Sequence, residues 1–388
     1  MLKIKTLNAI SPVYRNILDG ARYLVSAEAE APDAIIVRSA DMHGMPVDAS
    51  LLAVGRAGVG VNNIPLDELA QKGVVVFNSP GANANAVKEL VVAALLMASR
   101  RVSEGIQWTL DNKDDPDIAN LVEKGKKQFV GPELAGKTLG VIGLGAIGVM
   151  VANTGASLGM KVLGYDPYIS VEHAWSLSRS VKHSTDLSEV LKTSDYITLH
   201  VPLTDGTRKL LDAAAIEQMK PGAAIINYAR DALVDAEAVR EALEIGQLRA
   251  YVSDFPVPGL VGCRNTVFTP HLGASTPESE DNCVRIVAEE LDDYLVRGAI
   301  RNSVNYPACD PGRLTMPRVT VLHQNVPNVI GSVTGALAAA GLNIENMVNQ
   351  SRGAYAYTVL DLSDKPSPDV VAELGRLEAV YRVRLLTP

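Results

Sequence analysis

Cysteine is scarce in this chain of 388 residues, and its scarcity excludes two classes of protein. Cys263, Cys283 and Cys309 are odd in number and widely spaced, so neither a disulfide framework nor a zinc cluster is expected. None of the six histidines pairs with another histidine or a cysteine at the usual metal-ligand spacing. The sequence therefore predicts no metal site.

Long apolar and long basic stretches are also missing. The longest strongly apolar run, residues 90–98, is shorter than the roughly 20 residues that cross a bilayer. The N-terminal residues lack the apolar block of a signal peptide. The net charge is −8 and no basic tract offers contacts for phosphates, so nucleic acids are not expected partners. We therefore expect a soluble, cytoplasmic protein that binds neither membranes nor nucleic acids.

The chain is long enough for two or three domains. Two stretches alternate short β-branched runs with helical patterns, which predicts α/β domains whose parallel sheets are covered by helices on both faces. The first stretch has runs at 34–37, 52–54 and 74–77, and the second has runs at 138–142, 161–165, 196–200, 223–227 and 249–253. Residues 111–132 between them contain few large apolar side chains and are predicted to be a surface excursion.

The last 70 or so residues have a different pattern. Residues 305–317 contain proline and glycine, and their composition predicts a linker. The tail that follows shows the order βαββαβ, which predicts a ferredoxin-like module. Its expected elements are strands at 318–323, 347–351, 354–362 and 381–386, and helices at about 329–340 and 368–377.

A glycine-rich motif follows the apolar run at 138–142 and opens a helical segment. Gly143, Gly145 and Gly148 suit a tight turn, a close approach of the backbone to a pyrophosphate, and tight packing of the helix on the strand. The N–H groups of the new helix, beginning near Ala146 and Ile147, then face the anion.

Asp166 ends the next strand, 18 residues after Gly148, where its carboxylate can accept hydrogen bonds from both ribose hydroxyls. The pattern predicts a dinucleotide site. A carboxylate at this position repels a 2′-phosphate, so NAD is favoured over NADP.

Two further residues carry groups suited to catalysis. Arg230 follows the buried-looking run at 223–227 and so lies at the carboxyl end of a parallel sheet, where open sheets bind ligands. His271 lies in a loop just after the apolar residues 266–268. On position alone, Arg230 could equally be an ordinary surface arginine, and His271 could be a structural or solvated histidine.

Together these features resemble the D-2-hydroxyacid dehydrogenase family over nearly the whole chain. The matching motifs, in order, are Val-Arg-Ser at 37–39, Gly-Arg-Ala-Gly-Val-Gly-Val-Asn-Asn at 55–63, Phe-Asn-Ser-Pro-Gly at 77–81, Lys-Glu-Leu at 88–90, Gly-Leu-Gly-Ala-Ile-Gly at 143–148, His-Val-Pro-Leu-Thr at 200–204, Asn-Tyr-Ala-Arg at 227–230, Ser-Asp-Phe-Pro at 253–256 and Pro-His-Leu-Gly-Ala-Ser-Thr at 270–276.

The resemblance implies two doubly wound parallel-sheet domains and a smaller tail domain. Residues 1–92 and 285–305 would form the substrate domain, 93–284 a Rossmann domain for NAD, and 317–388 a regulatory domain. Arg230 would grip the substrate carboxylate and polarise the C2 oxygen. His271 would take the C2 hydroxyl proton. The resemblance further assigns the nicotinamide end of the cofactor to Asp254, Val201, Tyr228, Ala229, Gly273 and Ala274.

The sequence departs from the family pattern at three places. No acidic residue occurs in 255–270, where the family usually places a Glu that hydrogen-bonds the catalytic histidine. An imidazolium at position 271 is therefore expected to be less favoured than in relatives that keep the Glu. Asp231 stands where glycine is common, and Ala146 replaces a residue that is frequently basic.

The resemblance also suggests the substrate. Arg38, with Ser39, and Arg56 match positions at which D-3-phosphoglycerate dehydrogenases of this family hold the substrate phosphate and carboxylate end. Two guanidinium groups suit a phosphorylated acid better than lactate or glyoxylate. Val59, Gly60 and Asn62 would shape the floor of the same pocket.

In the tail, residues 323–330 and 341–344 resemble the ACT domains of serine-regulated members. His323, Asn325 and Asn343 match their serine-contacting positions, which suggests an L-serine effector bound across a homodimer or tetramer. A tail used only for dimerisation is the alternative.

The expected activity is NAD-dependent oxidation of 3-phosphoglycerate to 3-phosphooxypyruvate, the entry to serine biosynthesis. The alternatives are a glyoxylate or hydroxypyruvate reductase, and an NAD(H)-sensing regulatory protein with little turnover.

Overall fold

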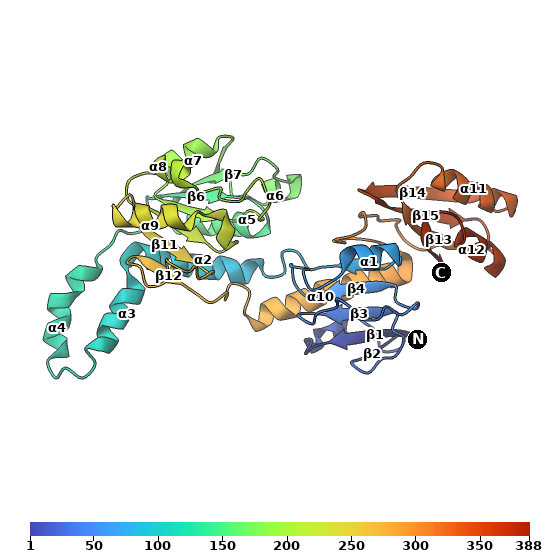
Figure 1. Ribbon diagram of the computed structural model, residues 1–388, viewed down its shortest axis with the longest axis horizontal. Coiled ribbons are helices and arrows are strands. Elements are labelled where there is room, and N and C mark those ends of the chain that lie inside the picture. The colour runs from blue at the N-terminus through green and yellow to red at the C-terminus, as the bar shows by residue number, and fades with distance from the viewer. The chain divides into compact units, whose positions relative to one another are not determined.

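The computed structural model describes residues 1–388, which divide into two compact units (Figure 1). The first unit consists of Met1–Ala82 and Glu280–Pro388, and the second of Asn83–Ser279. The sequence predicts a junction at 92–93, whereas in the structure residues 83–92 group with the second unit. They do so because they begin the long helix α2 (Ala84–Arg100), whose buried face packs within that unit.

The first unit contains a five-stranded parallel sheet in the order β2-β1-β3-β4-β5. Side chains alternate across it, so that Ala34 and Ile36 join one apolar cluster while Ile35 and Val37 join another. The elements of this part are β1 (Leu2–Leu7), η1 (Pro12–Asn16), β2 (Tyr23–Ser26), β3 (Ala34–Val37), β4 (Ala53–Arg56), α1 (Leu66–Gln71), β5 (Val75–Phe77) and α10 (Pro277–Arg297).

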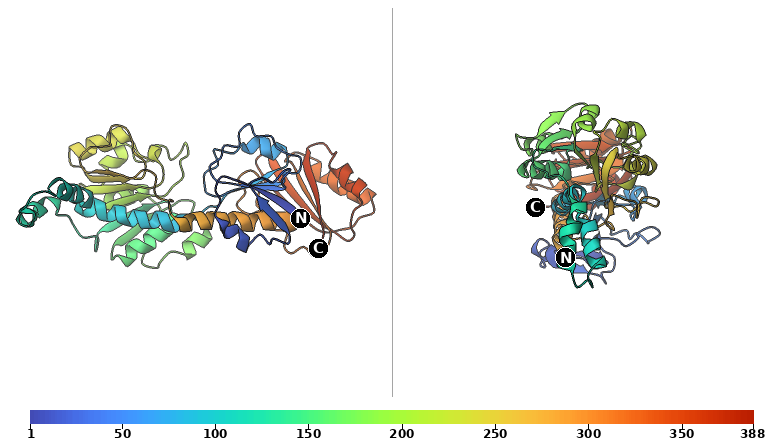
Figure 2. Two further views of the ribbon diagram at one scale, coloured as in Figure 1. Left: turned by 90° about the horizontal axis from the view of Figure 1, so that it is seen from below. Right: turned by 90° about the vertical axis from the view of Figure 1, so that its left-hand side faces the viewer.

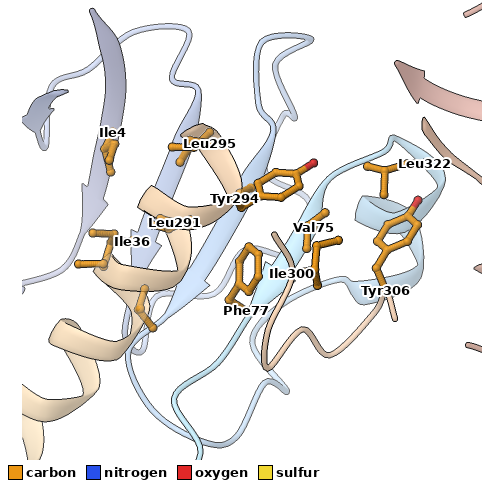
Figure 3. Packing of buried hydrophobic residues seen from close by; sticks show 14 of the residues in the cluster. Ile4, Ile36, Val75, Phe77, Leu291, Tyr294, Leu295, Ile300, Tyr306 and Leu322 are labelled. Carbon is orange, nitrogen blue, oxygen red and sulfur yellow. The ribbon is translucent and has the colours of Figure 1, made fainter. Parts of the chain in front are cut away.

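The main core of the first unit lies between this sheet and α10. Leu291, Tyr294 and Leu295 of α10 pack against Ile4, Ile36 and Phe77 of the strands (Figure 3). Leu322 of the tail belongs to the same cluster. The tail is therefore packed against the first sheet and α10 through a shared apolar core.

The tail forms a four-stranded antiparallel sheet in the order β14-β15-β13-β16. Its elements are β13 (Arg318–Gln324), α11 (Val329–Ala339), β14 (Ile344–Arg352), β15 (Tyr355–Leu362), α12 (Pro368–Leu374) and β16 (Val380–Leu386). The predicted ferredoxin-like order is confirmed. Each predicted element is present within a few residues of its expected bounds.

The predicted linker at 305–317 is more firmly held than its composition indicates. The Asn305 amide accepts from the N–H of Val76 and donates to the carbonyl of Val74, so it acts as an extra partner for β5. Arg318 is 1% exposed, forms an ion pair with Asp361, and donates to backbone carbonyls at positions 311–313. Side-chain hydrogen bonds thus fix the position of a segment that its proline and glycine content predicts to be a flexible linker.

The second unit contains a seven-stranded parallel sheet in the order β12-β11-β10-β9-β6-β7-β8. Helices α2 and α5 cover one face, and α7, α8 and α9 cover the other. Its strands are β6 (Thr138–Ile142), β7 (Lys161–Tyr165), β8 (Lys182–Ser184), β9 (Tyr196–Leu199), β10 (Ala223–Asn227), β11 (Leu248–Ser253) and β12 (Thr266–Phe268). Its remaining helices over the sheet are α5 (Ala146–Ser157), α6 (Val171–Trp175), α7 (Leu187–Thr193), α8 (Ala213–Glu217), η3 (Asp231–Leu233) and α9 (Ala236–Glu244). The predicted fold class, two parallel-sheet α/β domains with a small tail domain, is confirmed.

The surface excursion predicted at 111–132 is part of a helical hairpin. The hairpin consists of α3 (Val102–Asp111), α4 (Ile118–Gly125) and η2 (Lys126–Phe129), and it extends away from the second sheet in both views (Figures 1 and 2). Trp108 and Phe129 meet edge to face, with 6.0 Å between ring centroids. A side chain at Gly125 would lie 2.6 Å from the Trp108 ring, so the glycine makes this small core possible. No helix of the chain combines the length and the apolar character needed to cross a membrane.

A buried acid on α10 makes the stability of the first unit depend on pH. Glu290 is 3% exposed, and its burial raises the pKa of the carboxyl to about 8. Between about pH 4.5 and 8 the folded chain holds a proton that the unfolded chain releases, so stability falls as pH rises through this window. We expect Glu290→Gln to flatten that fall and to raise the urea midpoint at pH 8 but not at pH 4.5. Glu289→Gln on the exposed face is the control, and an equal change in both variants would contradict the prediction.

Candidate active site

The glycine-rich turn after β6 has the geometry that a dinucleotide loop needs. Gly143 has φ +93°, a conformation that side-chain-bearing residues rarely adopt. A Cβ on Gly148 would lie 1.8 Å from the carbonyl oxygen of Gly143, so this glycine allows α5 to pack on the turn. A Cβ on Gly145 would meet no atom within 4 Å. The backbone beside Gly145 is therefore open to a ligand.

Asp166 lies at the end of β7, next to this turn. Its carboxylate accepts from the N–H groups of Leu144 and Tyr168, each at 2.8 Å. These two bonds fix the orientation of the carboxylate and leave lone pairs for ribose hydroxyls. Val201 lies beside Gly143, and Ala146 and Ile147 begin α5 above the turn.

His200, behind the same turn, was not predicted as a site residue. It is half-buried, and desolvation lowers the pKa of its imidazole to about 3, so the ring is neutral at physiological pH. One ring nitrogen hydrogen-bonds the Thr198 hydroxyl at 2.9 Å. Its carbonyl lies 2.6 Å from the point where a Cβ on Gly143 would sit. His200 thus helps to shape the dinucleotide turn as a structural residue.

Together these residues fit NAD. The turn of residues 143–148 would hold the pyrophosphate at the N-terminus of α5, and Asp166 would hold the adenosine ribose. The cofactor supplies an acceptor or donor of hydride when bound.

Two glycine substitutions separate folding from cofactor binding. We expect Gly148→Ala to lower the melting temperature by several degrees and to abolish NAD binding, because the added methyl group collides with the turn itself. We expect Gly145→Ala to leave the melting temperature unchanged, because its Cβ meets no protein atom, yet to weaken NAD binding at least tenfold. Thermal unfolding and NAD titration test both. Equal NAD affinities for Gly145→Ala and the parent chain would contradict the assignment.

Arg230 follows β10 and is exposed. The guanidinium makes one hydrogen bond, to the carbonyl of Ala229 at 2.6 Å, so Asp231 does not neutralise it. The buried Asn227 shapes the turn: its amide donates to the carbonyl of Arg230 and accepts from the N–H of Ala229. Sequence reasoning missed Asn227 as a site residue, although a polar residue ending a buried apolar strand is a recognisable signal.

His271 follows β12, and its loop is held by the neighbouring strand end. Asp254, directly after β11, is 2% exposed. Its carboxylate accepts from the hydroxyl of Thr269 and from the N–H groups of Leu272 and Gly273, while its carbonyl accepts from the N–H of His271. His271 has φ +56°, and its exposed ring lies 4.8 Å from that of Phe255. The loop geometry is therefore set by Asp254, and the imidazole is free to meet a ligand.

The other predicted cofactor contacts lie around the same loops. Tyr228 is 5% exposed, hydrogen-bonds Thr269, and has its phenol pKa raised by burial. Only its backbone is available to a ligand. Gly273 is buried against Asp254, whereas Ala229 and Ala274 are half-buried. Because β12, β11 and β10 are neighbours in the sheet, the loops that carry His271, Asp254 and Arg230 are adjacent at one edge.

The predicted substrate arginines lie in the first unit, after two neighbouring strands. Arg38 follows β3 and forms an ion pair with Glu280 of α10 at 2.7 Å. Arg56 ends β4, and its pKa is lowered mainly by burial and also by the nearby charge of Arg38. Its Nε is buried without a hydrogen-bond partner. The structure thus brings two guanidinium groups together, and Glu280, 242 residues from Arg38 in sequence, is a third member that the sequence did not reveal.

The remaining predicted substrate residues line the same strand ends. Gly58, with φ +142°, lies under the Arg56 guanidinium, because a Cβ there would be 1.5 Å from Nη1. The N–H of Ser39 donates to the Asn8 side chain. Val59 is 40% exposed, and a Cβ on Gly60 would lie 3.3 Å from the side-chain oxygen of Asn62.

The three predicted effector residues differ in accessibility. His323 is 3% exposed, and its two ring nitrogens hydrogen-bond the Thr358 hydroxyl and the carbonyl of Gln324. Asn325 and Asn343 are exposed, and their amides donate to the carbonyl of Gly353 and to Glu345. The two asparagines are therefore available to a ligand, whereas His323 is committed within the tail.

Comparison with known proteins defines the class. Residues 92–273 match the family described as D-isomer specific 2-hydroxyacid dehydrogenase, NAD binding domain. A D-3-phosphoglycerate dehydrogenase from Haemophilus influenzae is 32% identical over 351 residues, which cover 87% of this chain and 81% of the relative. The chain belongs to the family of D-isomer-specific 2-hydroxyacid dehydrogenases, and its second unit contains the NAD-binding domain.

Further relatives also carry the name D-3-phosphoglycerate dehydrogenase. A D-3-phosphoglycerate dehydrogenase from Archaeoglobus fulgidus is 37% identical over 304 residues, covering 74% of this chain and 55% of the relative. The chain spans about half the length of this protein and of the namesake from Methanocaldococcus jannaschii, of which it covers 52%. The structure of NAD⁺-bound 3-phosphoglycerate dehydrogenase from Entamoeba histolytica matches with a TM-score of 0.58 and 25% identity, covering 78% of this chain and 98% of that one. The predicted family is confirmed.

Proposed function

We propose that the chain oxidises D-3-phosphoglycerate to 3-phosphooxypyruvate with NAD. The proposal rests on where Arg230 and His271 lie. Arg230 follows β10 and His271 follows β12, on either side of β11. Asp254, directly after β11, holds the His271 loop. The names of the relatives support the choice of substrate.

In this mechanism the guanidinium of Arg230 binds the substrate carboxylate and polarises the C2 oxygen. The imidazole of His271 accepts the proton of the C2 hydroxyl. NAD, when bound, would supply the acceptor for the hydride that leaves C2, so that the C2–O bond could become a carbonyl. In the reverse direction the imidazolium of His271 returns the proton to the alkoxide oxygen.

Arg38 and Arg56 supply the preference for a phosphorylated acid. Burial is the main cause of the lowered pKa of Arg56, and the positive charge of Arg38 adds to it; a phosphate dianion between the two guanidinium groups would offset both effects. A substrate without a phosphate would leave both effects in place. The Arg38 bond to Glu280 keeps one guanidinium oriented until the substrate binds.

A panel of D-hydroxy acids with NAD, followed by NADH absorbance, tests the proposal. We expect NADH with D-3-phosphoglycerate and much less with D-glycerate or D-lactate. Turnover confined to the unphosphorylated acids would instead indicate a glyoxylate or hydroxypyruvate reductase. NAD binding without turnover of any acid would indicate an NAD(H)-sensing regulatory protein. NADP in place of NAD should give little product, because Asp166 repels its 2′-phosphate.

We further propose that the tail is an ACT domain that binds L-serine through Asn325 and Asn343. Its contacts with α10 offer a route to the substrate site. Arg384 donates to the carbonyls of Tyr294 and Leu295, Arg318 to that of Arg297, and Tyr357 to that of Gly298. The tail thus caps the C-terminal end of the helix whose other end carries Glu280, the partner of Arg38.

Calorimetry with L-serine tests the effector. We expect binding that slows turnover, is lost in the double variant Asn325→Ala and Asn343→Ala, and persists without inhibition in Arg384→Ala. A folded chain that gives no heat with serine would remove the effector, leaving a tail used for association alone.

We also propose that the chain forms a homo-oligomer, either a dimer or a tetramer. The hairpin of α3 and α4 exposes Val102, Ile106 and Leu110 along one helix, an apolar stripe suited to a second copy. Strand β14 is an edge strand whose side chains are mostly exposed, so it can pair with another strand. Sedimentation velocity measures the oligomeric state, and a monomer at micromolar concentration would contradict the proposed oligomer.

Because all three cysteines are free thiols, we infer a reducing, cytoplasmic location.

A further inference from the structure

A cavity of about 510 Å³ lies in the second unit at the opposite edge of the sheet from the catalytic loops. It is lined by the beginnings of β11 and β12, the C-terminal ends of α2 and α9, and residues 130–132. Strand β11 separates it from Asp254. The lining reaches Val252, two residues before Asp254, but it contains none of the residues placed in the cofactor or substrate site.

Three arginines and one acid line this cavity: Arg101, Arg249, Arg264 and Glu104. Arg101 is neutralised by Glu104, with 3.1 Å between Nε and the carboxylate. Neither Arg249 nor Arg264 has an acidic partner, so the cavity carries two uncompensated positive charges in a chain whose net charge is −8.

Arg249 is the strongest sign of a missing partner. Its guanidinium lies 4.6 Å from the centre of the Tyr196 ring. Its Nε and Nη2 have no hydrogen-bond acceptor and are buried away from open space, so Nη1 is the nitrogen that a ligand in the cavity can reach directly. The Tyr196 hydroxyl is also buried without a partner. Buried donors without acceptors are unfavourable and rare in folded proteins. The fork of a guanidinium matches two oxygens of a carboxylate or phosphate.

The helix ends nearby explain the arginines only in part. The C-terminal ends of α2 and α9 carry partial negative charge, which favours cations close to them. No carbonyl of these ends accepts a hydrogen bond from Arg249, however, so the helix ends do not satisfy its donors. The lining of the cavity also contains the apolar side chains of Met97, Leu243 and Val267.

We propose that this cavity binds a small organic dianion, a dicarboxylate or a phosphomonoester. Arg249 and Arg264 bind the anionic groups, and the apolar wall accommodates the carbon chain. The site is separate from the arginine pair of the first unit, and it makes the second unit responsive to a metabolite that is neither substrate nor cofactor.

Thermal unfolding of the full chain tests this site, with succinate and inorganic phosphate as probes at constant ionic strength and acetate as the monoanionic control. We expect a rise in melting temperature on the order of 5 °C at about 100 times the dissociation constant. Acetate should give none. A larger shift with succinate assigns the natural ligand to dicarboxylates, and a larger shift with phosphate assigns it to phosphomonoesters.

Variants locate the binding. The double variant Arg38→Gln and Arg56→Gln removes the phosphate contacts proposed for the first unit, and the shift should remain in it. In that background Arg249→Gln and Arg264→Gln should each remove the shift. Arg264 is exposed, so its substitution leaves the fold intact. The proposal is overturned if the parent chain shows no shift, or if the shift depends on Arg38 and Arg56 instead. It is equally overturned if Arg249→Gln dissociates an oligomer while dianions have no effect, because an acid of a second copy would then fill the cavity.

Discussion

Replacing His271 by asparagine is expected to lower kcat by about 10²–10⁴-fold while leaving the fold intact, because it removes the general base. The loop is held by backbone bonds to Asp254, which do not involve the imidazole. Asparagine also tolerates the left-handed backbone found at this position better than most residues. Stopped-flow or steady-state NADH formation measures the loss.

The controls for this substitution are NAD affinity and melting temperature, neither of which should change. His183→Asn, at an exposed histidine on β8, should keep full activity. A His271→Asn variant that keeps the parent rate would show that another group moves the proton.

Replacing Arg230 by lysine is expected to lower kcat/KM by about 10²-fold, and replacing it by glutamine by more. Lysine keeps the charge but loses the two-pronged donor geometry that holds a carboxylate and polarises the C2 oxygen together. The Arg230 guanidinium has no acidic partner in the fold, so its loss should not affect stability.

NAD affinity should stay unchanged in both Arg230 variants. Arg240→Lys is the matched control, because Arg240 lies on α9 in exposed ion pairs with Glu237 and Glu244. Its activity should equal that of the parent chain. A lysine variant as active as the parent would mean that a single charge suffices and that the proposed geometry is wrong.

In the two parallel sheets, the strands that the sequence revealed most clearly are those buried on both faces. Runs such as Ala34–Val37 and Ala223–Asn227 are wholly apolar up to their last residue, because helices cover both sides of a parallel sheet. Strand β8 at the sheet edge was missed because its three residues, Lys-His-Ser, are polar and mostly exposed. Strand β2, only four residues long and also at an edge, gave no clear alternation.

The site residues also divide into those that the sequence could predict and those that it could not. Those in local motifs, such as Gly143, Asp166 and Arg230, could be selected because a turn or a strand end fixes their position. Glu280 could not, since its ion pair with Arg38 depends on how α10 packs on the first sheet. The support of the His271 loop by Asp254 was equally hidden, because it depends on the way two neighbouring strand ends meet.

Following the C2 hydrogen is the most direct test of the proposed hydride transfer, in which His271 and Arg230 act on the substrate. D-3-phosphoglycerate carrying deuterium at C2 is incubated with NAD, and the product nucleotide is analysed by mass spectrometry. With the parent chain we expect one deuterium in the reduced nicotinamide. His271→Asn and Arg230→Lys should form at least a hundredfold less of this labelled nucleotide, and the L-enantiomer should give none. Unlabelled reduced nucleotide, or label that does not depend on these two side chains, would contradict the proposed hydride transfer.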